Sequence, residues 1–231
     1  MELLNLQGWL FILRWIHFLA GITWIGVLYY FNFIQTPFFA EDLGGQARSA
    51  MMRGLVPRAL WWFRWGAMFT FLSGWTIVIT NMVTGGYGMD YYTLILTGGL
   101  MGTLMWFNVW FVIWPIQRGL IANAEATASG GQADEAAAAR APTAARASRT
   151  NTLFSIPMLF FMGTTSHMQQ LVSGAADYRA YWIVMLVVLA LVESNAFVSN
   201  PGQRPLGSVS GTITAGFIVT LVLFLAASFL L

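Results

Sequence analysis

Long apolar runs separated by short polar stretches dominate the chain. A helix that crosses a membrane needs about 20 mostly apolar residues, and six segments meet that length. They cover residues 9–34, 56–82, 91–115, 151–172, 180–198 and 212–231. Aromatic residues gather towards several of their ends, as is typical of helices at the lipid–water interface. The pattern predicts an all-α, polytopic membrane helix bundle of about six transmembrane helices in a single integral membrane domain.

Composition and charge support this class and exclude several others. Of the 231 residues, 58% are hydrophobic and 9% are charged, whereas soluble domains average about 25% charged residues. The net charge of +2 is too small and too dispersed for nucleic-acid binding. The chain has no cysteine, which excludes disulfides, iron–sulfur clusters and covalent haem attachment through C-x-x-C-H. The lipid bilayer is therefore the expected partner.

The arginines predict the orientation of the helices. With six spans, one side of the membrane receives Arg48, Arg53, Arg58, Arg118, Arg140, Arg146, Arg149 and Arg204. The other side receives only Arg179. Cytoplasmic loops carry the excess of basic residues, so we expect both termini outside, in a multi-pass protein of a bacterial inner membrane. The Ala-rich stretch 118–150 then becomes a cytoplasmic loop, within which residues 133–141 favour a short helix.

The chain has two histidines, and each lies inside a predicted span. At 1.5 Å per residue, His17 lies about 12 Å and His167 about 8 Å below the outer boundary. Ionisable groups at such depth are costly, and they commonly mark a functional site. We therefore expect the two imidazoles to face one cofactor between antiparallel helices.

Haem b suits this arrangement, because axial imidazoles hold it inside a helix bundle without cysteine. His17 and His167 are the expected iron ligands. Glycines one helical turn from each histidine would leave room for a flat ring, and arginines on the outer side would pair with its propionates. These four residues are Gly21, Gly163, Arg14 and Arg179.

Other interpretations of these polar residues remain open. A lone membrane histidine can hydrogen-bond across helices, and glycine faces can serve helix packing. A zinc or copper site is less well supported, because only two nitrogen ligands are available. Arg64 and Glu193 are interpreted as a buried ion pair between two helices, or else as a proton or quinone site. Asn108 is expected to form an interhelical hydrogen bond.

Three motifs resemble one known family, the bacterial membrane-bound urate oxidases (urate hydroxylase family). Trp15–Gly26, WIHFLAGITWIG, is similar to the first-helix signature of that family's N-terminal membrane domain. Phe107–Pro115, FNVWFVIWP, resembles a motif at the end of a later span. Residues 151–157, NTLFSIP, followed by Ser166-His167, fit the next helix. The resemblance extends over residues 9–172 and implies a membrane redox protein, with His17 and His167 as the matching histidines.

The resemblance leaves the activity open. Family members proposed to oxidise urate continue into a cytochrome c domain, which we do not expect here because the sequence ends in a sixth apolar segment and has no cysteine. We therefore expect a haem-b redox or electron-transfer protein, with or without urate-oxidase-like activity. Its electron partner would be a separate cytochrome c or a quinone. One alternative is an accessory subunit of a larger respiratory or photosynthetic membrane complex, or a homo-oligomer. Another is porphyrinogen oxidation, because the first span also resembles, more loosely, the small membrane protoporphyrinogen oxidases that use a first-span histidine with haem b.

Overall fold

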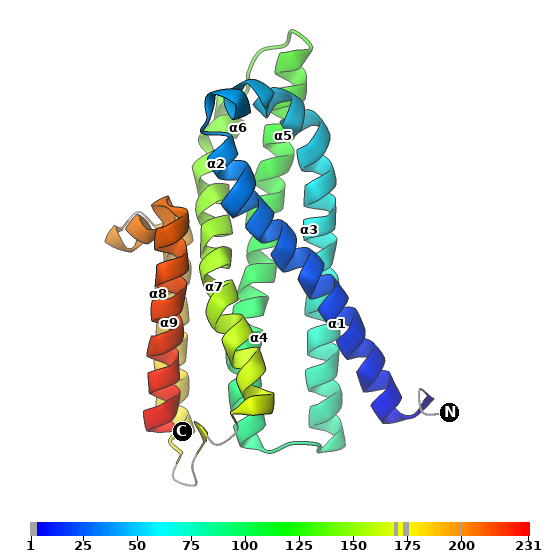
Figure 1. Cartoon of the computed structure of the whole chain (residues 1–231), viewed down its shortest axis with the longest axis vertical. Coiled ribbons are helices and arrows are strands. Elements are labelled where there is room, and N and C mark those ends of the chain that lie inside the picture. The colour runs from blue at the N-terminus through cyan, green and yellow to red at the C-terminus, as the bar shows by residue number, and fades with distance from the viewer. Residues whose placement is uncertain (1–3, 169–170, 173–175, 199) are drawn as a thin grey trace.

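Long helices standing side by side form the body of the protein (Figure 1). The computed structural model describes residues 4–168, 171–172, 176–198 and 200–231. The first part of the chain forms α1 (Leu6–Tyr29), η2 (Tyr30–Gln35), α2 (Thr36–Phe38), α3 (Asp42–Thr84), α4 (Met89–Phe107) and η3 (Asn108–Ile113). The remainder forms α5 (Trp114–Ala128), α6 (Glu135–Ala139), α7 (Ala141–His167), α8 (Tyr178–Phe197), η5 (Pro201–Gly207) and α9 (Val209–Leu230). The predicted all-α class is confirmed.

Several of these helices are long and apolar enough to cross a membrane. Within the described residues, the five such segments are Leu6–Phe38, Asp42–Thr84, Met89–Ala128, Tyr178–Phe197 and Val209–Leu230. They match five of the six predicted spans, and the chain is a multi-pass membrane protein. The first turn of α1 and the last turn of α9 lie at the same end of the bundle (Figure 1).

Helix α7 differs from the span predicted over residues 151–172. It starts earlier, ends at His167, and is not among the segments apolar enough to cross a membrane. Fourteen of its residues are buried, Arg149, Asn151 and Ser155 among them. Because neighbouring helices surround α7, its polar groups find protein partners and its surface need not match lipid. It is the central helix of the bundle, against which α4, α8 and α9 pack.

The Ala-rich stretch 118–150 is mostly helical in the structure. Helix α5 continues to Ala128, α6 occupies the place of the expected short helix, and α7 begins at Ala141. Alanine has the highest intrinsic helix propensity, so long helices extend beyond the apolar segments here.

Side chains at the helix ends fix where the helices begin and stop. The Asn5 side chain accepts a hydrogen bond from the Gly8 N–H at 2.9 Å, which starts α1, and Ser208 does the same for Gly211 at 3.0 Å at the start of α9. Helix α3 ends at Gly85, which has a φ of 69°. Glycine adopts this left-handed conformation without steric cost.

Two π-helical segments interrupt the long first and third helical stretches. η2 is followed by Pro37 and η3 by Pro115. A proline ring clashes with the carbonyl of the residue four positions earlier, and both of those positions fall inside the π-helical segments. Wider π turns relieve such a clash, and they occur often at functional sites. Each segment also buries an amide side chain, Asn32 in η2 and Asn108 in η3.

Glycines allow close approach of three helix pairs. A Cβ atom on Gly66 of α3 would lie 3.0 Å from the Trp24 backbone nitrogen in α1. On Gly98 of α4 it would lie 3.0 Å from the Met158 carbonyl, and on Gly216 of α9 3.1 Å from the Leu153 carbonyl, both in α7. Small residues at such crossings allow backbones to pack closely in membranes.

Candidate functional site

A cavity of about 620 Å³ lies between α1, α3, α4 and α7. Its wall is mainly apolar and includes several glycines, such as Gly21, Gly74, Gly99 and Gly102. Pockets that hold drug-sized ligands and cofactors span about 300–1,000 Å³ and are mostly apolar with a few polar groups. This cavity has that size and character.

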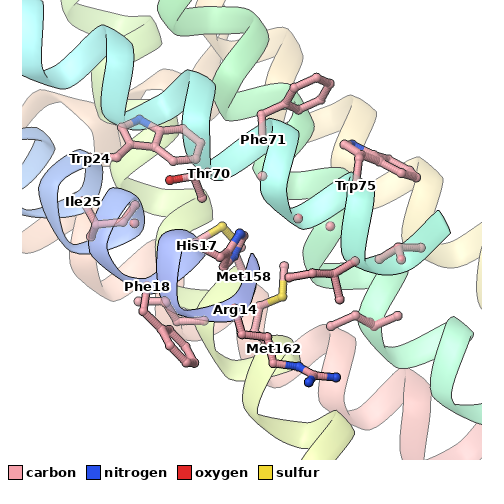
Figure 2. A pocket seen from close by; sticks show the side chains of 18 of the residues that line it. Arg14, His17, Phe18, Trp24, Ile25, Thr70, Phe71, Trp75, Met158 and Met162 are labelled. Carbon is pink, nitrogen blue, oxygen red and sulfur yellow. The ribbon is translucent and has the colours of Figure 1, made fainter. Parts of the chain in front are cut away.

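His17 enters the cavity from α1 (Figure 2). Its Nδ1 atom lies 3.1 Å from the Ser73 hydroxyl oxygen on α3. A Cβ atom on the next residue, Gly74, would lie only 2.9 Å from the His17 Cε1 atom. Ser73 and Gly74 therefore position the imidazole, one by a hydrogen bond and the other by leaving space.

The hydrogen bonds of Ser73 determine which imidazole nitrogen is free. The Ser73 hydroxyl donates to the Phe69 carbonyl at 2.6 Å, so its oxygen acts as acceptor toward His17. The His17 Nδ1–H then donates to Ser73, and in the neutral imidazole Nε2 retains its lone pair. A histidine that ligates a metal characteristically donates its other N–H to an acceptor in this way.

The structure gathers half of the predicted site residues at this cavity. Arg14, His17 and Gly21 line it, all from α1. Gly163, His167 and Arg179 are not among its lining residues, and all three are exposed. His17 therefore lies at the cavity and His167 does not. Ligation of a haem iron by His167 stays a prediction.

The rotation of α7 explains why His167 misses the cavity. Ser166 lines the cavity, and His167 follows it directly. Successive residues of an α-helix point about 100° apart around its axis, so His167 points along a different face. Counting residues from the ends of the spans predicts the depth of the two histidines, but it does not predict the rotation of α7 about its axis.

Two methionines of α7 line the cavity and were not predicted as site residues. Figure 2 shows Met158 and Met162 beside the space that His17 enters. Methionine is flexible and commonly fills irregular space in protein cores, so its presence alone does not indicate a site. Their spacing of four residues, on one helical face, was the available signal.

A second polar cluster ties three helices together outside the cavity. The Asn108 side-chain amide donates to Asn151 Oδ1 at 3.0 Å and to Glu193 Oε2 at 3.2 Å. Asn151 in turn donates to the Met105 carbonyl at 2.9 Å. The predicted interhelical role of Asn108 is confirmed.

The predicted ion pair between Arg64 and Glu193 is not formed. The Arg64 guanidinium carbon lies 3.9 Å from the ring centre of Trp114 and 5.3 Å from that of Trp110. Stacking on aromatic rings stabilises a cation electrostatically, while Glu193 is held by Asn108 instead. The interpretation of Arg64 and Glu193 as an ion pair between two helices was wrong, because the two side chains have different partners.

Comparison with known protein families gives a match over residues 89–227, from the first residue of α4 into α9. The matching family is described as urate oxidase N-terminal. More than half of the chain is covered. The chain belongs to the urate oxidase N-terminal family. The predicted resemblance is confirmed, and the motifs over residues 107–115 and 151–157 fall inside the match.

The family match leaves α1 and α3 outside its range, so it covers one side of the cavity, α4 and α7, but not His17. No curated protein and no solved structure matches the chain. Assignments to His17 therefore depend on the geometry described above.

The cavity residues fit a haem, which His17 would hold. In the tautomer whose Nδ1–H donates to Ser73, the His17 Nε2 carries the lone pair, and glycines from three helices leave room for a flat ring. Arg14, also in the lining, supplies a cation for a carboxylate.

Proposed function

We propose that this member of the urate oxidase N-terminal family is a membrane-embedded redox protein that binds haem b in the cavity, with His17 as an axial ligand. One observation carries the proposal. A histidine oriented by Ser73 enters a ligand-sized apolar cavity inside a helical bundle.

The residues of the chain have separate tasks in this proposal. His17 would hold the haem, and Ser73 would keep the imidazole in the tautomer that this requires. Arg14 pairs with a propionate, since a guanidinium binds carboxylates in a fixed fork geometry. The apolar wall excludes water, which raises the strength of these electrostatic contacts. The bound haem would supply one-electron chemistry.

The substrate and the electron partner are also part of the proposal. Membership of the family supports urate as the compound oxidised, with electrons passing to a separate cytochrome c or to a quinone. A bacterial inner membrane is the proposed location. Electron transfer to a quinone suits a cavity that lies among membrane-crossing helices.

The decisive experiment compares the two histidines in purified full-length protein. Wild-type protein reduced with dithionite should show the absorption bands of haem b, and a pyridine haemochrome assay should give one haem per chain. His17→Ala should lose most of this haem, whereas His167→Ala, at an exposed position, is the matched control and should retain it. Wild-type protein without haem, or His17→Ala with full haem content, would exclude the proposal.

Arg14→Ala gives a second readout. Removal of the cation that pairs with a propionate should shift the midpoint potential to lower values, because a nearby positive charge stabilises the reduced, more negative haem. Arg179→Ala is the control, since Arg179 is exposed and lies outside the cavity lining. An unchanged potential in Arg14→Ala would remove Arg14 from the site.

A further inference from the structure

We infer that the cavity opens sideways into the lipid bilayer and that a membrane quinone docks at this opening as the electron acceptor; the inference rests on the proposed function. The opening, which we call the mouth, is bordered by Phe18 and Ile22 of α1 and by Leu159 of α7. These three side chains line the cavity and are nevertheless 65%, 72% and 51% exposed. A side chain that lines a cavity and is also exposed lies at its edge, so the three mark where the cavity meets its surroundings.

The path of α1 creates the mouth. Close to its C-terminal end α1 touches α7, because the Tyr29 hydroxyl oxygen lies 2.8 Å from that of Ser155. Toward its N-terminus α1 lies on α3 instead, where the His17 Nδ1 atom is 3.1 Å from the Ser73 hydroxyl oxygen. Figure 1 shows the resulting oblique course of α1 across the bundle. Helices α1 and α7 therefore diverge from Ser155 onward, and the mouth lies between them.

The mouth lies at a depth where lipid surrounds the protein. Ile22 is in the middle of the apolar segment Leu6–Phe38, which is long enough to cross a membrane. Large apolar side chains that are exposed at such a depth contact hydrocarbon chains, which cost them nothing, whereas water would. A molecule dissolved in the membrane can therefore enter the mouth directly. A water-soluble protein such as a cytochrome c would meet lipid first.

The chemistry of the mouth suits a quinone. A quinone has a flat ring whose carbonyl oxygens accept hydrogen bonds, and an apolar tail that stays in the lipid. Ser166 lies seven residues after Leu159, so the two share one face of α7, and Ser166 is exposed and lines the cavity. Its hydroxyl supplies a donor for a quinone carbonyl, and the apolar side chains of the mouth accommodate the tail. A lipid acyl chain would use only the apolar part.

The electrons and protons of the reaction balance with a quinone as acceptor. Hydroxylation of one urate with an oxygen atom from water releases two electrons and two protons. One quinone takes up two electrons and two protons and becomes a quinol. The electrons reach it one at a time through the cofactor, so no soluble acceptor is required.

The position of the mouth is tested by site-directed spin labelling of the full-length protein. The chain has no cysteine, so a single introduced cysteine carries the nitroxide at one known place. In phospholipid vesicles, labels on Ile22→Cys and Leu159→Cys should be relaxed more by molecular oxygen, which concentrates in lipid, than by a water-soluble nickel chelate. Ser129→Cys, exposed at the end of α5, is the control and should show the opposite order. Labels at the mouth that respond mainly to the nickel chelate, or to neither reagent, would overturn the inference.

The occupant is tested with haem-loaded protein in the same vesicles, reduced and freed of excess reductant. Decylubiquinone dissolved in the lipid should reoxidise wild-type protein faster than soluble cytochrome c does. Ile22→Trp narrows the mouth and should lower the rate with decylubiquinone about tenfold relative to the rate with ferricyanide, because a larger side chain in a filled site weakens binding. Leu159→Trp repeats this test from α7. Ile183→Trp is the matched control, since Ile183 is exposed on α8 and does not line the cavity.

Several results would overturn the inference. These are reoxidation by cytochrome c but not by decylubiquinone, unchanged quinone rates in both mouth variants, or an equal loss of rate in Ile183→Trp. A mouth that faces lipid in protein that does not react with decylubiquinone would mean that acyl chains alone occupy it, and would also refute the quinone. Absence of haem from wild-type protein would instead refute the proposed function, and the spin-label results would still show whether the cavity opens to lipid.

Discussion

Gly74→Ala is expected to displace the His17 imidazole with little effect on the fold. The added Cβ would lie 2.9 Å from His17 Cε1 and 3.3 Å from Nδ1, whereas ordinary contacts begin at 3.4 Å. The ring must therefore move by about 0.5 Å, which is the tolerance within which functional groups need to be held. The atom it meets is the end of a side chain, so the ring and not the backbone will yield.

The free-energy terms of this substitution nearly cancel. Loss of the hydrogen bond between His17 and Ser73 costs about 0.5–1.5 kcal/mol. Replacement of glycine by alanine inside a helix contributes up to about 1 kcal/mol in the opposite direction. The melting temperature in detergent should thus stay close to the wild-type value, while haem content falls and the absorption spectrum changes.

Gly163→Ala is the control for this substitution. Gly163 is exposed on α7 outside the cavity lining, and a Cβ there would meet no atom within 4 Å. Haem content and spectrum should therefore remain as in the wild type. Two results would refute the reasoning: a Gly74→Ala protein with wild-type haem content and spectrum, or an equal loss of haem in both variants.

Three further substitutions test other parts of the structure. Ser73→Ala removes the acceptor of the His17 Nδ1–H and should weaken haem affinity about 10–100-fold, measured by haem titration of the apoprotein; unchanged affinity would contradict the orienting role. Gly66→Ala places a Cβ 3.0 Å from the backbone of Trp24, which cannot yield, and should destabilise the protein by about 1–3 kcal/mol. A melting temperature equal to that of the wild type would count against this close contact. Asn151→Leu removes the buried hydrogen bonds that Asn151 makes with Asn108 and with the Met105 carbonyl, which should lower the free energy of unfolding by about 1–3 kcal/mol in a denaturant titration; a free energy of unfolding equal to that of the wild type would contradict this expectation.

Much of the fold followed from local properties of the chain. Apolar length located five of the membrane-crossing helices to within a few residues of their cores, since lipid imposes a minimum length on each one. The fourth predicted span coincides with part of α7, but this helix is not among the segments apolar enough to cross a membrane. Its buried residues include Arg149 and Asn151, which only surrounding helices can accommodate.

The candidate site was partly accessible from sequence. His17 was found because an ionisable group in an apolar run is unusual, and Arg14 and Gly21 followed from helical spacing on the same element. Ser73 and the methionines Met158 and Met162 were not found, because they belong to helices other than α1. Nothing in the local sequence of α3 or α7 indicates that these residues face His17.

The sequence by itself determined that the protein is a multi-pass helical membrane protein, that it has very few ionisable groups within its apolar segments, and that its motifs resemble one family. The tertiary structure decided which of those groups share a cavity, which pair with each other, and which face away. Hydropathy determines whether a helix enters the bilayer, but rotation about the helix axis is determined by packing against neighbouring helices. A difference of one residue, from Ser166 to His167, is therefore enough to move a side chain off the cavity wall.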